Sequence, residues 1–227
     1  MRIFLQALVL LTFISCNKIG VSETEAKAIK KVLAFYGGRA NYSIGFDTRN
    51  GSNVNFFELK INESPLLNND REWITIHAGN IAYLFYSNLN EEKKSKYNQI
   101  RVSVDLTNGE SRSYKFSESE LKEIEELYPE IEKTSKYIKY GDYTSLMNQF
   151  SKKVDIEEKE LEGFFGEIIS KYGMITDIQM HGFTFFEEEG YGDCVEIVQF
   201  IALKEKSGPI ILVYSRETNE LIGLHLP

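Results

Sequence analysis

The stretch QIRVSVDLTNGESRSYKF, Gln99–Phe116, carries the clearest secondary-structure signal in the chain. Apolar and polar residues alternate from Ile100 to Leu106, and this period of two predicts a strand with one buried face. Asn108-Gly109 is a preferred dipeptide of tight hairpin turns. We therefore predict two antiparallel strands here, the second of which covers Arg112–Phe116.

The residues that precede this hairpin predict a helix, two strands and a second helix. Ser22 and Glu25 have the spacing of a capping box, and the helix that follows ends at Gly37-Gly38. The other predicted elements are strands at Tyr42–Phe46 and Val54–Ile61, joined through Asn50-Gly51, and a helix at about Glu72–Leu89.

Helices dominate the segment after the hairpin. Ser117 and Glu120 form a second capping box, and Pro129 stands where a new helix could start. Asp155 is expected to cap a further helix that ends at Gly173. The apolar stripe of that helix comprises Ile156, Leu161, Phe164, Phe165, Ile168, Ile169 and Tyr172.

Four strand candidates with short connections complete the chain and indicate antiparallel hairpins. They are Ile175–Phe186, Cys194–Lys204, Ile210–Ser215 and Leu221–Leu226. The predicted fold class is therefore α+β, with antiparallel sheets packed against helices. We expect an N-terminal domain at 22–134 and a C-terminal domain at 135–227.

The C-terminal part resembles the cystatin-like cone, and more narrowly the secreted bacterial members of the nuclear-transport-factor-2-like superfamily. The resemblance is carried by Tyr140-Gly141-Asp142-Tyr143, by Lys171-Tyr172-Gly173 at the end of a helix, and by Ile222-Gly223-Leu224 in the last strand. It implies a bent sheet wrapped around a helix, often with a pocket at the open end. Enzymatic members place an Asp, His or Tyr in that pocket, but no catalytic motif of the family can be matched here.

The first residues, MRIFLQALVLLTFISC, have the features of a secretory signal peptide at 1–15. A basic Arg2 precedes an apolar run, Ile3–Ile14, that would span about 18 Å as a helix, too short for a bilayer core of about 30 Å. Phe13-Ile14-Ser15-Cys16 resembles the lipobox of bacterial lipoproteins, although Phe13 departs from the usual Leu. An ordinary signal peptide, with Cys16 a chance residue, is the alternative.

The lipobox resemblance implies that the Cys16 thiol carries a diacylglycerol and that cleavage before it exposes an amino group for further acylation, palmitate included. Residues 16–21 would then be a lipidated tether. Three acyl chains hold a protein at a membrane far more firmly than one. Asn17 is not the Asp that favours inner-membrane retention in lipoproteins, so we expect the outer membrane, with the protein facing the periplasm or the cell surface.

Composition argues against some partners. The formal net charge is −8, and nucleic acids and anionic lipid head groups require basic patches. Cys16 and Cys194 are the only cysteines, so lipidation of Cys16 leaves no intramolecular disulfide partner. We expect no nucleic-acid partner and no disulfide framework.

The sequence contains no HExxH, GxSxG, P-loop or Rossmann glycine motif. His77 is expected to be a packed residue near the inner face of its helix, and His225 is expected to point outward. We therefore expect no catalytic residue, cofactor or metal.

The stretch HGFTFFEEEGYGDC gathers the candidate binding residues, which are His181, Glu187, Glu188, Glu189, Tyr191 and Asp193. Such a set could bind a divalent cation or supply acid–base groups. The alternative, which we prefer, is a solvated hairpin loop whose charges protect edge strands from aggregation.

These observations predict a non-enzymatic, membrane-anchored lipoprotein whose folded part binds a protein or a small ligand. One alternative is a hydrolase or isomerase that uses a pocket in the C-terminal cone, with His181 or an acidic residue as base. The other is a structural component of the cell envelope.

Overall fold

The computed structural model describes residues 20–49 and 52–226. The predicted signal peptide, Cys16 and the Asn50-Gly51 turn lie outside the described residues. Within the described ranges, no helix is both long and apolar enough to cross a membrane.

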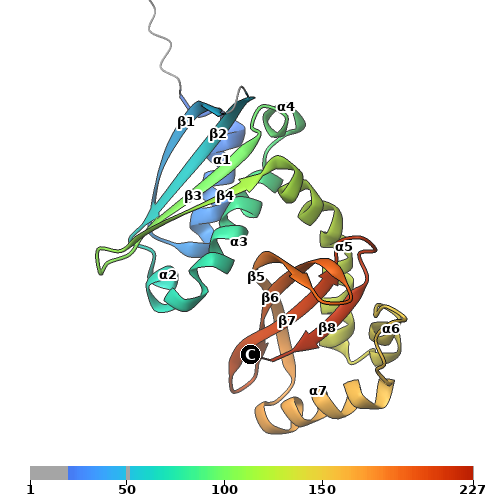
Figure 1. Cartoon of the computed structure of the whole chain (residues 1–227). Helices are drawn as coiled ribbons and strands as arrows, with labels where there is room; N and C mark the ends of the chain where they lie inside the picture. Colours follow the sequence, from blue (N-terminus) through green and yellow to red (C-terminus); the bar gives the residue numbers. More distant parts are fainter. Residues whose placement is uncertain (1–19, 50–51, 227) are drawn as a thin grey trace, which may run out of the picture.

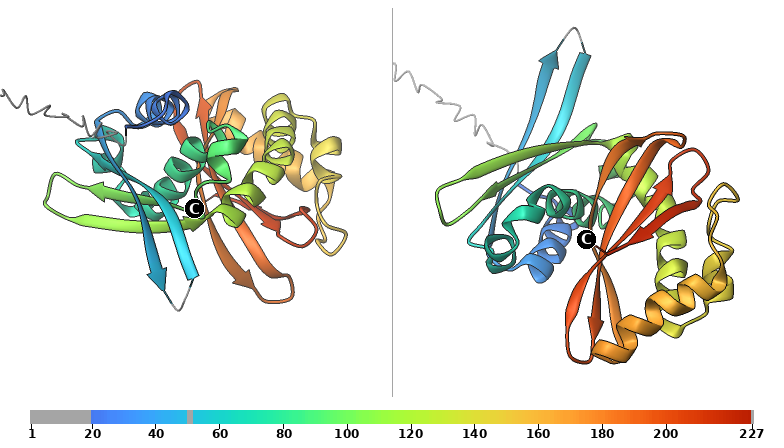
Figure 2. Two further views of the ribbon diagram at one scale, coloured as in Figure 1. Left: turned by 90° about the horizontal axis from the view of Figure 1, so that it is seen from above. Right: turned by 60° about the horizontal axis from the view of Figure 1, so that its bottom comes forward.

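The first half of the described chain builds a four-stranded sheet with the strand order β1-β2-β3-β4 (Figure 1). Helices cover one face of this sheet, and the β1–β2 hairpin projects beyond them (Figure 2). The strands are β1 (Arg39–Arg49), β2 (Ser52–Asn62), β3 (Gln99–Asp105) and β4 (Ser111–Ser117). The helical segments are α1 (Glu23–Tyr36), α2 (Pro65–Asn69), the 3-10 turn η1 (Arg71–Trp73), α3 (Ile74–Ser87) and α4 (Glu91–Lys94).

The central pair of this sheet, β2 and β3, is parallel, whereas β1–β2 and β3–β4 are antiparallel. Parallel neighbours need a crossover, and the helical segments between β2 and β3 provide it. The apolar residues Ile100, Val102 and Val104 of β3 are buried beneath these helices, as their alternation predicts.

The second half builds an antiparallel sheet with the order β5-β6-β7-β8. α5 packs across its inner face, where the Tyr214 hydroxyl donates a hydrogen bond to Thr134 Oγ1 at 2.9 Å. α7 contributes the buried Leu161 and Phe165 to the same core. The elements are α5 (Glu118–Tyr140), α6 (Tyr143–Met147), α7 (Glu158–Tyr172), β5 (Ile175–Glu188), β6 (Gly192–Leu203), β7 (Ser207–Ser215) and β8 (Leu221–His225).

The two sheets share one hydrophobic core. A single cluster of buried residues includes Ile81 of α3, Ile124 of α5 and Ile197 of β6, and α3 lies against the edge strand β5. The predicted boundary between residues 134 and 135 falls inside α5, which is continuous. The division into two domains and the cystatin-like assignment of the second half stay predictions.

The predicted α+β class is confirmed, as are both capping boxes, the β3–β4 hairpin and the four C-terminal strands. The sheets are antiparallel apart from the β2–β3 pair. His225 is exposed and His77 is buried, as predicted.

Two predictions about helix starts were wrong. Pro129 does not begin a helix but lies within α5, which continues because apolar residues are buried both before and after it, among them Leu127 and Ile131. This burial outweighs the cost of about 3 kcal/mol for an interior proline. Asp155 does not cap α7, because the cap residue is Glu157, whose backbone N–H is bound by Glu160 at 2.9 Å.

Candidate ligand pocket

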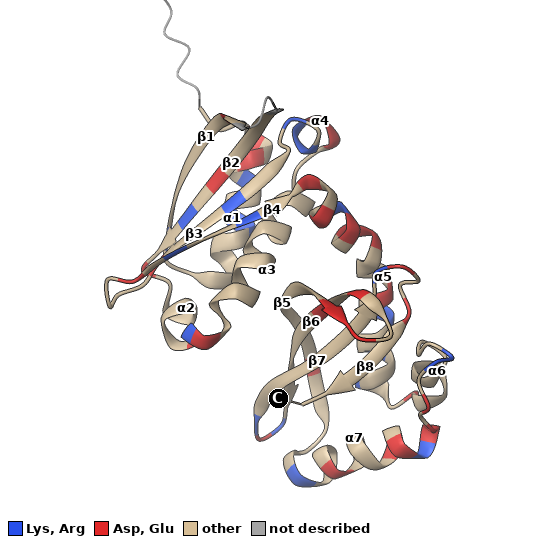
Figure 3. Ribbon diagram, viewed as in Figure 1, with Lys and Arg blue, Asp and Glu red and all other residues tan. Residues whose placement is uncertain are grey.

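Acidic residues gather at the tip of the β5–β6 hairpin (Figure 3). Glu187, Glu188, Glu189 and Asp193 are exposed there, and Tyr191 is half-buried. Glu187 faces Asp193 across the hairpin, and Glu188 faces Gly192. Glu189 and Tyr191 lie at the turn. Within residues 20–49 and 52–226, no group of three or more His, Cys, Asp or Glu side chains is placed to hold a metal ion.

Arg216, which follows β7, ties this hairpin to α5. Its guanidinium donates two hydrogen bonds to the Glu123 carboxylate, at 2.7 and 2.8 Å, and lies 4.0 Å from Asp193 Oδ2. It also packs 4.4 Å from the centre of the Phe185 ring. The tip end of the hairpin is therefore held by charge pairing and by packing of the guanidinium on the Phe185 ring. The neighbouring Cys194 is buried, and burial raises the pKa of its thiol, which disfavours a reactive thiolate.

His181 does not join the acidic residues. It lies six positions before Glu187 in β5, about 20 Å away in extended conformation. Its ring stacks on Phe200 at 4.1 Å and lies 5.8 Å from the His77 ring. Burial, followed by the charge of His77, lowers the His181 pKa to about 4. The side chain therefore stays neutral at ordinary pH, inside the junction between α1, α3 and β5.

This junction contains a polar cluster, which we define as the buried Tyr36, His77 and Asn80 together with the half-buried His181. Asn80 Nδ2 donates to the Tyr36 hydroxyl at 2.9 Å, and that hydroxyl lies 3.4 Å from His77 Nδ1. Burial lowers the His77 pKa even though Asp70 lies 3.7 Å from its Nε2. Two of its buried ring nitrogens, His77 Nε2 and His181 Nδ1, have no hydrogen-bond partner among the described residues, so the polar groups of the cluster are only partly satisfied.

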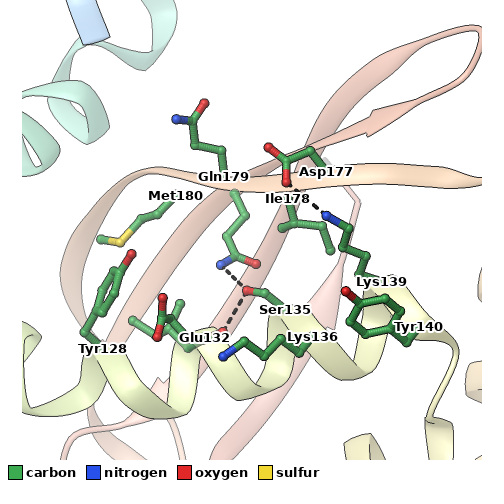
Figure 4. Close-up of a pocket in the computed structure, with 12 residues that line it drawn as sticks. Tyr128, Glu132, Ser135, Lys136, Lys139, Tyr140, Asp177, Ile178, Gln179 and Met180 are labelled. Atoms are coloured by element: carbon green, nitrogen blue, oxygen red, sulfur yellow. Dashed lines mark hydrogen bonds and ion pairs between the residues drawn. The ribbon is translucent and has the colours of Figure 1, made fainter. Parts of the chain in front are cut away.

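A pocket that the sequence did not reveal lies between α5 and the strands β5 and β6, with a cavity volume of about 290 Å³ (Figure 4). One wall is a face of α5, because Tyr128, Glu132, Ser135 and Lys139 follow each other at spacings of four, three and four residues. The other wall consists of Asp177, Ile178, Gln179 and Met180 from β5, with Gln199 from β6.

Gln199 is the central polar residue of this pocket and is only 2 % exposed. Its Nε2 donates to Ser135 Oγ at 2.8 Å, and Ser135 Oγ in turn donates to the Ile131 carbonyl at 2.7 Å. Its Oε1 is buried and has no hydrogen-bond partner among the described residues. An unpaired buried acceptor costs about 1–3 kcal/mol, so a donor from a ligand or a water would be favourable at this atom.

Charged and aromatic residues form the rim of the pocket. Lys139 Nζ pairs with Asp177 Oδ1 at 3.2 Å, as Figure 4 shows. Tyr128 is half-buried at one end of the α5 wall, and burial, followed by the charge of Glu132, raises its pKa. Tyr140 lies at the other end and is 78 % exposed. The pocket thus offers an ion pair, an unpaired amide oxygen and two phenol rings.

The sequence holds one signal that could have found this pocket. In the strand VEIVQFIAL, Gln199 occupies the same face as Ile197 and Ile201, which are both buried. A polar residue on the inward face of a strand is unusual and needs a partner. The polar residues of α5, in contrast, look like an ordinary solvated helix surface.

No protein-family model, no curated protein and no solved structure matches this chain.

Proposed function

We propose that the protein is a membrane-anchored lipoprotein whose folded part binds a small molecule, without catalysis, in the pocket between α5, β5 and β6. The lipobox-like residues at Cys16 support the anchor. The observation that carries the binding proposal is Gln199, a residue that lines the cavity and whose buried Oε1 lacks a partner among the described residues. Pockets with a few convergent polar groups are the usual small-molecule sites of proteins.

The chemistry of the lining supports binding rather than turnover. The Ser135 hydroxyl donates to the Ile131 backbone carbonyl and accepts from the Gln199 amide. No residue that lines the pocket is a histidine or a cysteine. A serine nucleophile needs an adjacent base that takes its proton. The alternative hydrolase or isomerase function has His181 or an acidic residue as base. His181 does not line this pocket, and of the two acidic residues that do, Glu132 and Asp177, the second is paired with Lys139 at 3.2 Å.

Binding is tested on the protein purified in detergent, with a set of small polar molecules that includes neutral sugars, amino acids, carboxylates and amines. Saturation-transfer NMR detects the molecules that bind, and the same set is then offered to Gln199→Leu. Gln149→Leu, a half-buried glutamine outside the pocket, is the matched control. We expect at least one molecule to bind the wild type and the control but to bind Gln199→Leu about tenfold more weakly, the loss expected for one hydrogen bond to a buried group.

Two results would contradict the proposal. One is the absence of any binding from the whole set at millimolar concentration. The other is binding that is equally strong in Gln199→Leu, since the ligand would then occupy a different place. A melting curve of each variant by circular dichroism identifies a loss of binding that comes from unfolding.

A further inference from the structure

The side-chain amide of Gln199 determines which hydrogen-bonding group the centre of a ligand must present. Its Nε2 is already engaged by Ser135, whereas its Oε1 is a free acceptor. An acceptor needs a donor, so the ligand presents an O–H or N–H group at this point. A carboxylate or a phosphate placed here would bring its own acceptor oxygens against Oε1.

The charges around the pocket disfavour a ligand with a net charge. Glu132 and Asp177 stand on the lining together with Lys136 and Lys139, so both signs are present in equal number. The lining therefore has no excess of either sign that would select an anion or a cation. Because Lys139 and Asp177 already pair with each other at 3.2 Å, neither is left to neutralise a ligand charge. A neutral ligand with many donors and acceptors can hydrogen-bond to groups of both signs.

Two tyrosines mark the length of the pocket. Tyr128 and Tyr140 are 12 residues apart on α5, which places their Cα atoms about 18 Å apart along the helix axis. The ring of Tyr83 packs against the ring of Tyr128, with 5.5 Å between the ring centres, and so holds Tyr128 in place. Phenol rings combine an apolar face with a polar tip, so they bind ligands that also have one apolar and one polar aspect. A single small ring cannot reach both tyrosines.

We propose that the ligand of this pocket is a short, neutral oligosaccharide, with a hydroxyl donating to Gln199 Oε1 and sugar rings packed against Tyr128 and Tyr140. This inference rests on the proposed binding function and specifies its ligand class. Sugar hydroxyls both donate and accept, and the C–H faces of sugar rings are apolar. A linear chain of rings also has the elongated shape that the α5 wall requires.

The test compares four oligosaccharides of equal length by saturation-transfer NMR and calorimetry on the protein in detergent. Maltotriose and tri-N-acetylchitotriose are neutral, tri-galacturonate is anionic, and the trimer of glucosamine is cationic. We expect a neutral trimer to bind most tightly and Gln199→Leu to weaken it about tenfold. Tyr140→Ala should weaken it several-fold, and this exposed position removes the risk of unfolding. Tyr42→Ala, an exposed tyrosine on β1, is the matched control and should bind as the wild type does.

The outcomes separate the two proposals. If a charged trimer or a non-sugar molecule binds most tightly and depends on Gln199, the oligosaccharide inference is wrong and the binding function stands. If neither neutral trimer binds at millimolar concentration, the oligosaccharide inference is also wrong. If no molecule of either set binds, the binding function itself fails.

Discussion

A Cβ atom at Gly182 of β5 would lie only 1.9 Å from the backbone carbonyl oxygen of Ile76 in α3. The contact is reciprocal, because a Cβ at Gly79 of α3 would lie 2.7 Å from the Phe183 carbonyl oxygen. The helix and the edge strand therefore approach each other backbone to backbone. This approach joins the first sheet and its helices to the second sheet.

Gly182→Ala is expected to destabilise the protein by about 3 kcal/mol or more, because the methyl group forces β5 away from α3 and the φ of 154° disfavours a side chain. Chemical denaturation measures this loss. Gly208→Ala on β7 is the control, since a Cβ there meets no atom within 4 Å, and it should change the free energy of unfolding by less than about 0.5 kcal/mol. Equal effects of the two variants would show that the approach of α3 and β5 is not tight.

Acid should weaken the fold through the two histidines at this junction. Burial lowers the pKa of His77, and it lowers that of His181 from 6.5 to about 4. The unfolded chain therefore binds more protons than the folded one in this window, and stability falls as the pH drops from 6.5 toward 4. Urea unfolding at a series of pH values measures this dependence.

His181→Gln should reduce the pH dependence between 6.5 and 4, because it removes a histidine whose pKa burial lowers to about 4. His225→Gln, at an exposed position of β8, should leave the dependence as it is in the wild type. A wild type whose free energy of unfolding is constant between these pH values would refute the account of a neutral histidine pair at this junction.

Glu25 of α1 is a buried carboxylate that stabilises the fold through its hydrogen bonds. Burial opposes its ionisation, but the Tyr97 hydroxyl, the Ser22 backbone N–H at 2.6 Å and Lys93 outweigh burial and lower its pKa from 4.5 to about 2. Its contribution is therefore complete above pH 4.5 and is lost as the pH falls toward 2.

Glu25→Gln should cost about 1–3 kcal/mol at neutral pH, because an amide cannot accept from all of these donors. Glu23→Gln is the matched control on the same helix turn, since the Glu23 side chain is 86 % exposed and its pair with Lys27 contributes little. Thermal melting of both variants at pH 7 decides between them, and similar melting temperatures would contradict the importance of Glu25.

Lipidation is expected at Cys16, which lies outside the described residues. Cys16→Ser should abolish the incorporation of labelled palmitate and leave the N-terminal signal uncut by the lipoprotein peptidase. Cys194→Ser should still incorporate the label, because Cys194 is buried in the fold. Label in the Cys16→Ser protein would mean that the lipobox resemblance is misleading.

Local patterns in the sequence determined most of the secondary structure. The alternation in β3, the capping boxes at Ser22 and Ser117, and the Asn108-Gly109 turn each depend on residues a few positions apart. These local interactions depend little on the rest of the fold, so the sequence alone predicts them. Pro129 is the exception. Its local preference for the start of a helix is outweighed by the burial of apolar residues before and after it in α5.

Only the tertiary structure decided which segments meet. The parallel pairing of β2 with β3 and the contact of Gly182 with Ile76 join segments that are distant in the chain. The pocket has the same origin, since Gln199 and Ser135 are 64 residues apart and their hydrogen bond forms when α5 packs on the second sheet. The local sequence determines the backbone conformation that each residue prefers. A cavity depends on how whole helices and strands pack against one another, and no single stretch of sequence specifies that packing.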